Sequence, residues 1–176
     1  MSASFWDWSI ERYDQDGVAS TLLDLQDNFG LNVNVLLWCG WCAQDFADIP
    51  ELVLRKAVDL AEHWTSDVTG PLRQARRALK SPPRQADAQE TQSLRSEIKA
   101  LELRAEKIEQ EMLAALARDG LDLAESGAAA GRARRNFARY IALAGAQKRP
   151  GFSVLAIDAL AEKLYPAADA STGAQD

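Results

Sequence analysis

The sequence of 176 residues is long enough for one domain with a buried core, and its 47% hydrophobic and 26% charged residues exclude an intrinsically disordered chain. A net charge of −6 argues against general nucleic-acid binding. The sequence has no secretory signal and no apolar segment of membrane-spanning length, so we expect a cytoplasmic protein without a membrane span. Ten glycines and six prolines are few for an all-β protein, and the many helix-forming residues predict an all-α fold.

Two amphipathic helices are predicted before residue 30. Ser4 and Asp7 have the spacing of a helix-capping pair, so the first helix should run from about residue 5 to residue 15. A turn at Asp16-Gly17 leads to a second helix, which Gly30 ends. Helical spacing predicts that the first helix buries Trp6, Ile10 and Tyr13 and that the second buries Val18, Leu22, Leu25 and Phe29.

The segment of about residues 31–46 predicts the central helix of the fold. From Val35 to Ala43 it has no charged or strongly polar side chain, so all sides of this helix are apolar. The segment is too short to cross a bilayer, and either Asn32 or Asn34 can cap its start. We therefore expect the other helices to pack around it.

A fourth helix and a short basic helix are predicted to follow. Pro50-Glu51 is a helix start, Gly70-Pro71 should break or kink the helix, and a basic helix should then run to about Lys80. The predicted buried stripe of the fourth helix is Val53, Ala57, Leu60, Ala61, Trp64 and Val68.

The longest periodic run covers about residues 87–117. Its apolar residues alternate spacings of four and three, which is the heptad pattern of a coiled coil, and acidic and basic residues flank them. The heptad positions are Leu94, Ile98, Leu101, Ala105, Ile108, Met112 and Ala115. Such a long charged helix is expected to form one half of a helical hairpin.

Two C-terminal helices should fold back after Asp119-Gly120. The first is predicted over 132–144, and Ser153 should cap a last helix that ends at Leu164. The predicted inner face of the first is Ala133, Phe137, Tyr140, Ile141 and Ala144.

These elements predict one all-α domain over residues 1–166, a multi-helix bundle around the buried central helix. It divides into a bundle of residues 1–80, a proline-rich connection at 81–86, and the long helix with the returning helices at 87–166. The small and polar residues 167–176 should form a disordered tail.

No cofactor, metal or catalytic site is predicted. Cys39 and Cys42 have the spacing of a redox dithiol, but that chemistry needs the first thiol at the exposed start of a helix after a strand. We expect both to be buried structural thiols. Zinc would need four ligands, and His63 lies on another helix, where it is expected at the surface. Asp24 and Asp27 form a D-x-x-D pair that is expected on a solvent face.

Charge is unevenly distributed along the chain. Residues 1–51 hold nine acidic residues and one arginine, whereas residues 127–150 hold six basic residues and no acid. A candidate interaction face in the basic segment consists of Arg132, Arg134, Arg135 and Arg139. These arginines could contact nucleic-acid phosphates, or they could pair with the glutamates of the long helix at 97–111. Pairing within the molecule is the favoured interpretation.

The N-terminal part carries an aromatic and aliphatic signature. It consists of Ser4-Phe-Trp-Asp-Trp-Ser9, Tyr13, Val18, Leu22-Leu23, Leu25-Gln26 and Asn32-Val-Asn-Val-Leu-Leu-Trp38. This signature resembles an uncharacterised family of small cytoplasmic proteobacterial proteins, known as a conserved domain of unknown function. The resemblance is densest over residues 4–43, and it implies a bacterial source and a helical domain but no catalytic residue.

The sequence does not determine a biochemical activity. The uneven charge, the heptad-patterned helix and the lack of a catalytic constellation favour a non-enzymatic cytoplasmic adaptor that binds another protein. One alternative is a nucleic-acid or ribosome-associated factor that uses the arginine-rich helix. A second alternative is a binder of a small or lipid-like molecule, with an aromatic pocket lined by Trp6, Trp38 and Trp64.

Overall fold

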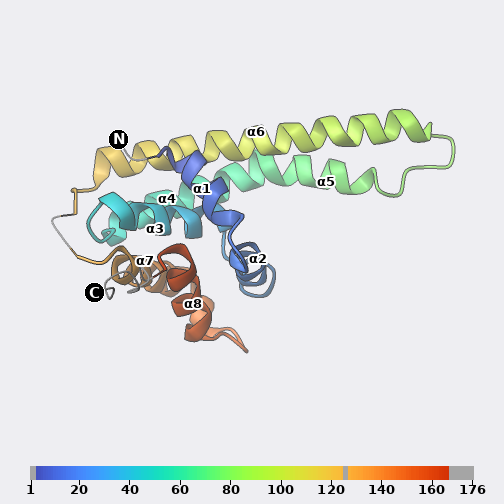
Figure 1. Cartoon of the computed structure of the whole chain (residues 1–176). Helices are drawn as coiled ribbons and strands as arrows, with labels where there is room; N and C mark the ends of the chain where they lie inside the picture. Colours follow the sequence, from blue (N-terminus) through green and yellow to red (C-terminus); the bar gives the residue numbers. More distant parts are fainter. Residues whose placement is uncertain (1–2, 125–126, 167–176) are drawn as a thin grey trace, which may run out of the picture.

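The computed structural model describes residues 3–124 and 127–166, and over these residues the fold is the predicted all-α bundle (Figure 1). The helices are α1 (Phe5–Tyr13), α2 (Val18–Phe29), α3 (Val33–Asp45), α4 (Glu51–Trp64), α5 (Gly70–Ala78), α6 (Ala88–Gly120), α7 (Ala129–Ala144) and α8 (Val154–Leu164). A π-helical segment (Thr65–Thr69) joins α4 to α5, and a 3-10 turn (Ala146–Lys148) follows α7. No helix in the described ranges is long and apolar enough to span a membrane. The predicted tail at 167–176 lies outside the described residues.

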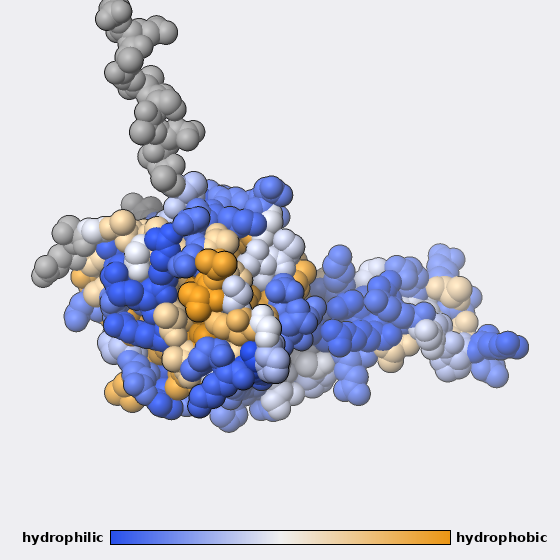
Figure 2. All heavy atoms as spheres, turned by 90° about the horizontal axis from the view of Figure 1, so that it is seen from below, coloured by the Kyte–Doolittle hydropathy of each residue, from blue (hydrophilic) through white to orange (hydrophobic). Residues whose placement is uncertain are grey.

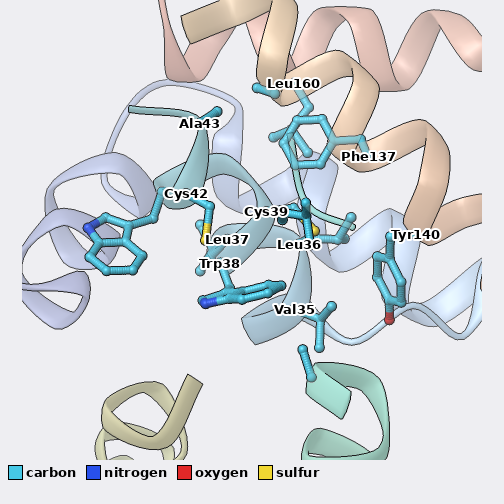
Figure 3. Close-up of a cluster of buried hydrophobic side chains, with 14 of the residues drawn as sticks. Val35, Leu36, Leu37, Trp38, Cys39, Cys42, Ala43, Phe137, Tyr140 and Leu160 are labelled. Carbon is cyan, nitrogen blue, oxygen red and sulfur yellow. The ribbon is translucent and has the colours of Figure 1, made fainter. Parts of the chain in front are cut away.

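Helix α3 is the centre of the core, as its apolar sequence predicts. Every residue from Val35 to Ala43 is buried, and α3 lies between α6 and the α7–α8 pair (Figure 1). Asn32 caps its start, because the side-chain oxygen accepts a hydrogen bond from the Val35 N–H at 3.1 Å. Figure 3 shows the side chains of α3 beside Phe137 of α7 and Leu160.

Buried hydrogen bonds fix α3 against the helices on both sides. The Trp38 indole N–H donates to the Leu113 carbonyl oxygen of α6 at 2.8 Å. The side chain of Asn136 in α7 accepts from the Ile49 N–H at 3.1 Å and donates to the Cys39 carbonyl at 3.2 Å. Because Trp38 and Asn136 are fully buried, these bonds favour one register of α3 against its neighbours.

The junction of α4 and α5 stays helical where Gly70-Pro71 predicted a break or kink. The Gly70 N–H donates to the Thr65 carbonyl, so the chain passes through a π turn and continues directly into α5. In a regular α-helix the proline ring clashes with the carbonyl four residues earlier, and the wider turn accommodates it. A Cβ on Gly70 would lie 2.6 Å from the Thr65 carbonyl oxygen, so only glycine fits without a backbone shift.

We expect Gly70→Ala to lower the free energy of unfolding by about 1–3 kcal/mol, because the new methyl group can be accommodated only by moving backbone. Gly131→Ala is the matched control. A Cβ there meets only the Arg135 guanidinium at 3.6 Å, so alanine should leave stability unchanged or raise it by up to about 1 kcal/mol through its helix propensity. Urea unfolding of the two variants measures the difference, and equal effects would refute this account of the π turn.

Helix α5 and the first half of α6 form the predicted helical hairpin, which extends beyond the rest of the molecule and is called the arm here (residues 70–104) (Figure 1). Ion pairs join its helices at the base: Arg73 pairs with Glu106 and Arg76 with Glu102, each at 2.6 Å. No residue of α5 is buried. Seen from below in Figure 2, the arm is mostly hydrophilic, whereas hydrophobic residues gather on the body.

The predicted heptad seam is confirmed only in part, because Ala105 is buried and Ile98 and Met112 are half-buried, whereas the alternate positions are exposed. The buried residues of α6 are Glu102, Ala105, Glu109, Gln110, Leu113, Ala114 and Ala117. Of the heptad positions, Leu94, Leu101 and Ile108 are 47%, 49% and 39% exposed. Because α5 presents arginines to α6, ion pairs decide which face of α6 turns toward it.

The predicted buried face of α1 is wrong. The core residues of α1 are Phe5, Trp8 and Ser9, whereas Trp6 and Tyr13 are half-buried and Ile10 is 45% exposed. Trp8 decides the rotation, because it packs so closely on Gly40 of α3 that a Cβ there would lie 3.1 Å from the indole. The opposite face of α1, with Trp6, Ile10 and Tyr13, is therefore not part of the core.

The buried faces predicted for α2, α4 and α7 are confirmed in part. All four predicted residues of α2 are buried, and so are Ala57 and Ala61 in α4. The buried Leu54 of α4 was not predicted, whereas four predicted residues are only half-buried, namely Val53, Leu60 and Trp64 of α4 and Val68 of the π-helical segment. In α7 the prediction is confirmed for Ala133, Phe137, Tyr140 and Ile141, whereas Ala144 is exposed.

Candidate functional site

A half-open cleft of about 440 Å³ lies between α1, α2, the start of α3 and the α5–α6 hairpin. Its aromatic and aliphatic lining consists of Trp6, Ile10, Tyr13, Leu23, Val33, Leu37 and Leu103. The face of α1 that is turned away from the core supplies the first three. The volume lies in the range of small-molecule sites, which spans roughly 300–1,000 Å³. We call it the Glu109 cleft, after the residue at its floor.

A chain of buried and half-buried polar side chains lines the Glu109 cleft. The Ser9 hydroxyl donates to the Gln110 side-chain oxygen at 2.9 Å, and the Gln110 amide donates to the Asn34 side-chain oxygen at 2.9 Å. The Asn34 amide then donates to Oε2 of Glu109 at 2.9 Å. Three helices thus hold Glu109 in place: α1 through Ser9, α3 through Asn34, and α6, on which Glu109 lies.

Glu109 is 1% exposed, and its second oxygen is not satisfied. Within the described residues, Oε1 is buried and has no hydrogen-bond partner. The pKa of Glu109 is raised from 4.5 to about 7, chiefly because the carboxyl group is buried and to a smaller extent because of the charge of Glu106. The amides of Asn34 and Asn32 and the charge of Arg73 act in the opposite direction but are weaker than burial.

The wall opposite α1 is charged. It contains the Arg73–Glu106 and Arg76–Glu102 ion pairs at the base of the arm. Arg77 also lines the cleft and forms no ion pair within the described part of the chain. The carboxylates of the two pairs already have cationic partners, whereas the buried Oε1 of Glu109 has no hydrogen-bond partner among the described residues.

The described residues contain no group of three or more His, Cys, Asp or Glu side chains that could hold a metal ion. A carboxyl group that titrates near neutral pH, in a cleft with aromatic walls, can accept a hydrogen bond or exchange a proton with a bound molecule.

The predicted pocket of three tryptophans is not what the structure shows. Trp6 lines the cleft, but Trp38 is fully buried in the core, and Trp64 donates its indole N–H to the Ala105 carbonyl at 3.0 Å. Trp38 and Trp64 therefore attach α6 to the body. Sequence reasoning missed Glu109, because it falls among the alternating charges of α6 and nothing local distinguishes it from exposed glutamates.

The predicted arginine face lies on α7, away from the Glu109 cleft, and its members differ in role. Arg132 is buried and donates to the carbonyl oxygens of Ala43 and Gln44 at 2.9 and 3.4 Å, and to that of Gly127 at 2.9 Å. Its guanidinium thus donates to carbonyl oxygens at the C-terminus of α3, where a helix has no further backbone N–H groups to donate to them.

The other three arginines of this face, of which Arg134 is half-buried and two are exposed, pair within the molecule. Arg135 binds Asp48 at 2.7 Å, and this bond lowers the pKa of Asp48. Arg139 donates to the Ile49 carbonyl and also contacts Asp48, and Arg134 pairs with the carboxylates of α8. Pairing within the molecule is confirmed, but the predicted glutamate partners at 97–111 are wrong, because α3 and α4 lie between α7 and α6 (Figure 1). An interaction face on these arginines stays a prediction.

The remaining candidates behave as predicted. Cys39 and Cys42 are buried free thiols, and burial raises the pKa of both, which disfavours the reactive thiolate (Figure 3). His63 is exposed, as is the D-x-x-D pair of α2, in which Asp24 accepts a hydrogen bond from Asn28.

Comparison with known proteins gives a family but no function. No curated protein and no solved structure matches this chain. One family model matches residues 4–113, from α1 through most of α6, and this range contains every residue that lines the Glu109 cleft but neither α7 nor α8. The chain therefore belongs to DUF2390, a family of proteins of unknown function.

Proposed function

We propose that this protein binds a small molecule in the Glu109 cleft, and that the molecule joins an N–H donor to an apolar or aromatic body. The observation that carries the proposal is the buried Oε1 of Glu109, which has no hydrogen-bond partner within 3.5 Å among the described residues although Glu109 lines a cleft. A buried acceptor without a partner is costly, so a ligand that supplies a donor gains affinity there.

The lining of the cleft narrows the class of ligand. Trp6, Ile10 and Tyr13 offer an apolar surface, while Asn32 and Gln26 can orient a polar edge. A primary amine is favoured over a carboxylate, because an anionic group would meet the charge of ionised Glu109. An amine binds the ionised form of Glu109, so its affinity should fall as pH is lowered through about 7.

A matched pair of ligands tests the proposal. Phenethylamine has an aromatic ring with an ethyl chain that ends in an ammonium group. Ethylbenzene has the same carbon skeleton without the ammonium group. Chemical-shift titration at pH 8 should place phenethylamine against Trp6 and Tyr13, with ethylbenzene bound more weakly. Glu109→Gln should weaken phenethylamine binding by about ten- to a hundredfold, as expected for loss of a charged hydrogen bond.

The control is Glu111→Gln, on the same helix but exposed and outside the cleft. It should leave binding unchanged. Equal binding of the two ligands, or equal binding by wild type and Glu109→Gln, would refute a donor site at Glu109.

A second function, binding of another protein, is supported by the exposed heptad residues of the arm. Leu94, Leu101 and Ile108 are large apolar side chains in one register on a helix that projects from the body. The nucleic-acid alternative has less support, because the arginines of α7 already contact carboxylates and carbonyls of the same chain.

A further inference from the structure

Alternate heptad positions of α6 form an exposed apolar stripe, which consists of Leu94, Leu101 and Ile108, although the pattern is that of a coiled coil. Leu94, Leu101 and Ile108 are spaced seven residues apart, and all three are exposed. Ile98 and Met112 lie between and beyond them in the alternating four-and-three register and are half-buried. A stripe that keeps a seven-residue repeat favours packing against another helix with the same repeat.

The arm also lacks the core expected of an independent two-helix element. Helix α5 contributes no buried residue, and the Arg73–Glu106 and Arg76–Glu102 ion pairs join it to α6 at the base of the arm. Two such arms packed together would form a four-helix bundle, in which the stripe of α6 is the central layer. The stripe from Leu94 to Ile108 is about 21 Å long, at 1.5 Å per residue.

We infer that the partner of this stripe is a second copy of the chain, packed antiparallel. The charges beside the stripe support this choice. An antiparallel pair centred near Leu101 brings Glu97 of each copy beside Arg104 of the other, which gives two attractive contacts. A parallel pair would instead bring Glu97 beside Glu102 of the second copy, and Glu102 is already buried against Arg76.

The antiparallel arrangement also suits the shape of the molecule. The body lies at the C-terminal end of α6, and the tip of the arm at its N-terminal end (Figure 1). Antiparallel pairing therefore places the two bodies at opposite ends of the dimer and brings Leu94 of one copy beside Ile108 of the other.

Sedimentation equilibrium of the full chain tests this inference up to about 100 µM, where a micromolar dissociation constant gives mostly dimer. We expect wild type to dimerise and Leu101→Glu to be monomeric, because it places two carboxylates at the centre of the interface. Leu103→Glu is the matched control. Leu103 is 55% exposed on the same helix, but it faces the Glu109 cleft, so this variant should remain dimeric.

Charge reversal tests the orientation. Glu97→Arg and Arg104→Glu should each weaken the dimer, and the double variant should restore it, because both attractive contacts are rebuilt with opposite sign. Circular dichroism checks that each variant keeps its helix content. A wild type that stays monomeric would overturn the inference, and so would a dimer that Leu101→Glu leaves intact. Failure of the double variant to restore the dimer would overturn the antiparallel pairing.

Discussion

Trp38→Ala should lower the free energy of unfolding by about 4 kcal/mol. Trp38 is fully buried on α3, and its indole N–H donates to the Leu113 carbonyl of α6 at 2.8 Å. Alanine removes one of the two largest side chains of the central helix, leaves a cavity and removes the hydrogen bond from α3 to the Leu113 carbonyl. Urea unfolding followed by circular dichroism measures the loss, which is a large fraction of the stability of a typical domain.

Leu52→Ala is the control for this prediction. Leu52 is 67% exposed on α4, so its truncation should change stability by less than about 0.5 kcal/mol. Trp38→Phe should fall between the two, because it keeps most of the apolar volume but loses the hydrogen bond to Leu113. If Trp38→Ala were as mild as Leu52→Ala, α3 would not be the centre of the core.

Glu109→Gln should stabilise the protein at alkaline pH and have little effect at acidic pH. The pKa of Glu109 is about 7 in the folded chain and near the usual 4.5 when unfolded, so between these values the folded state binds more protons. The stability of wild type therefore falls as pH rises through this window, by up to about 3 kcal/mol. Glutamine cannot ionise and resembles the protonated acid, so the variant escapes this loss.

Unfolding free energies of wild type and Glu109→Gln at pH 5 and pH 8 measure the effect. The variant should exceed wild type at pH 8, and the gap should nearly close at pH 5. Glu111→Gln, which replaces an exposed glutamate two residues away, should show no such pH-dependent gain. A constant difference between wild type and Glu109→Gln at both pH values would show that Glu109 ionises normally.

Local sequence patterns were sufficient to predict where the helices lie, but not which face of each helix is buried. The capping residues Ser4, Asn32 and Ser153 act as predicted, because a helix start depends on a few neighbouring residues. The rotation of α1 and α6 depends on partners far away in the chain. Trp8 orients α1 by packing on Gly40, and the arginines of α5 pair with glutamates of α6, while the alternate heptad positions of α6 stay exposed.

The Glu109 cleft could not be found from local sequence for the same reason. Ser9, Asn34 and Glu109 meet only after three helices pack, and Asn34 and Glu109 are 75 positions apart. In the sequence, Glu109 is one of several glutamates on an amphipathic helix, where exposure is the usual outcome. Burial of a charged residue is a property of the assembled fold, and it is what marks this site.

A carbon-13 NMR titration of the Glu109 carboxyl group, with and without phenethylamine, tests the proposed site most directly. Glu109→Gln identifies the signal. We predict a pKa of about 7 for the free protein, and a lower value when saturating amine stabilises the ionised form. A pKa near 4.5 that does not change with amine would contradict both the buried carboxyl and its role in binding.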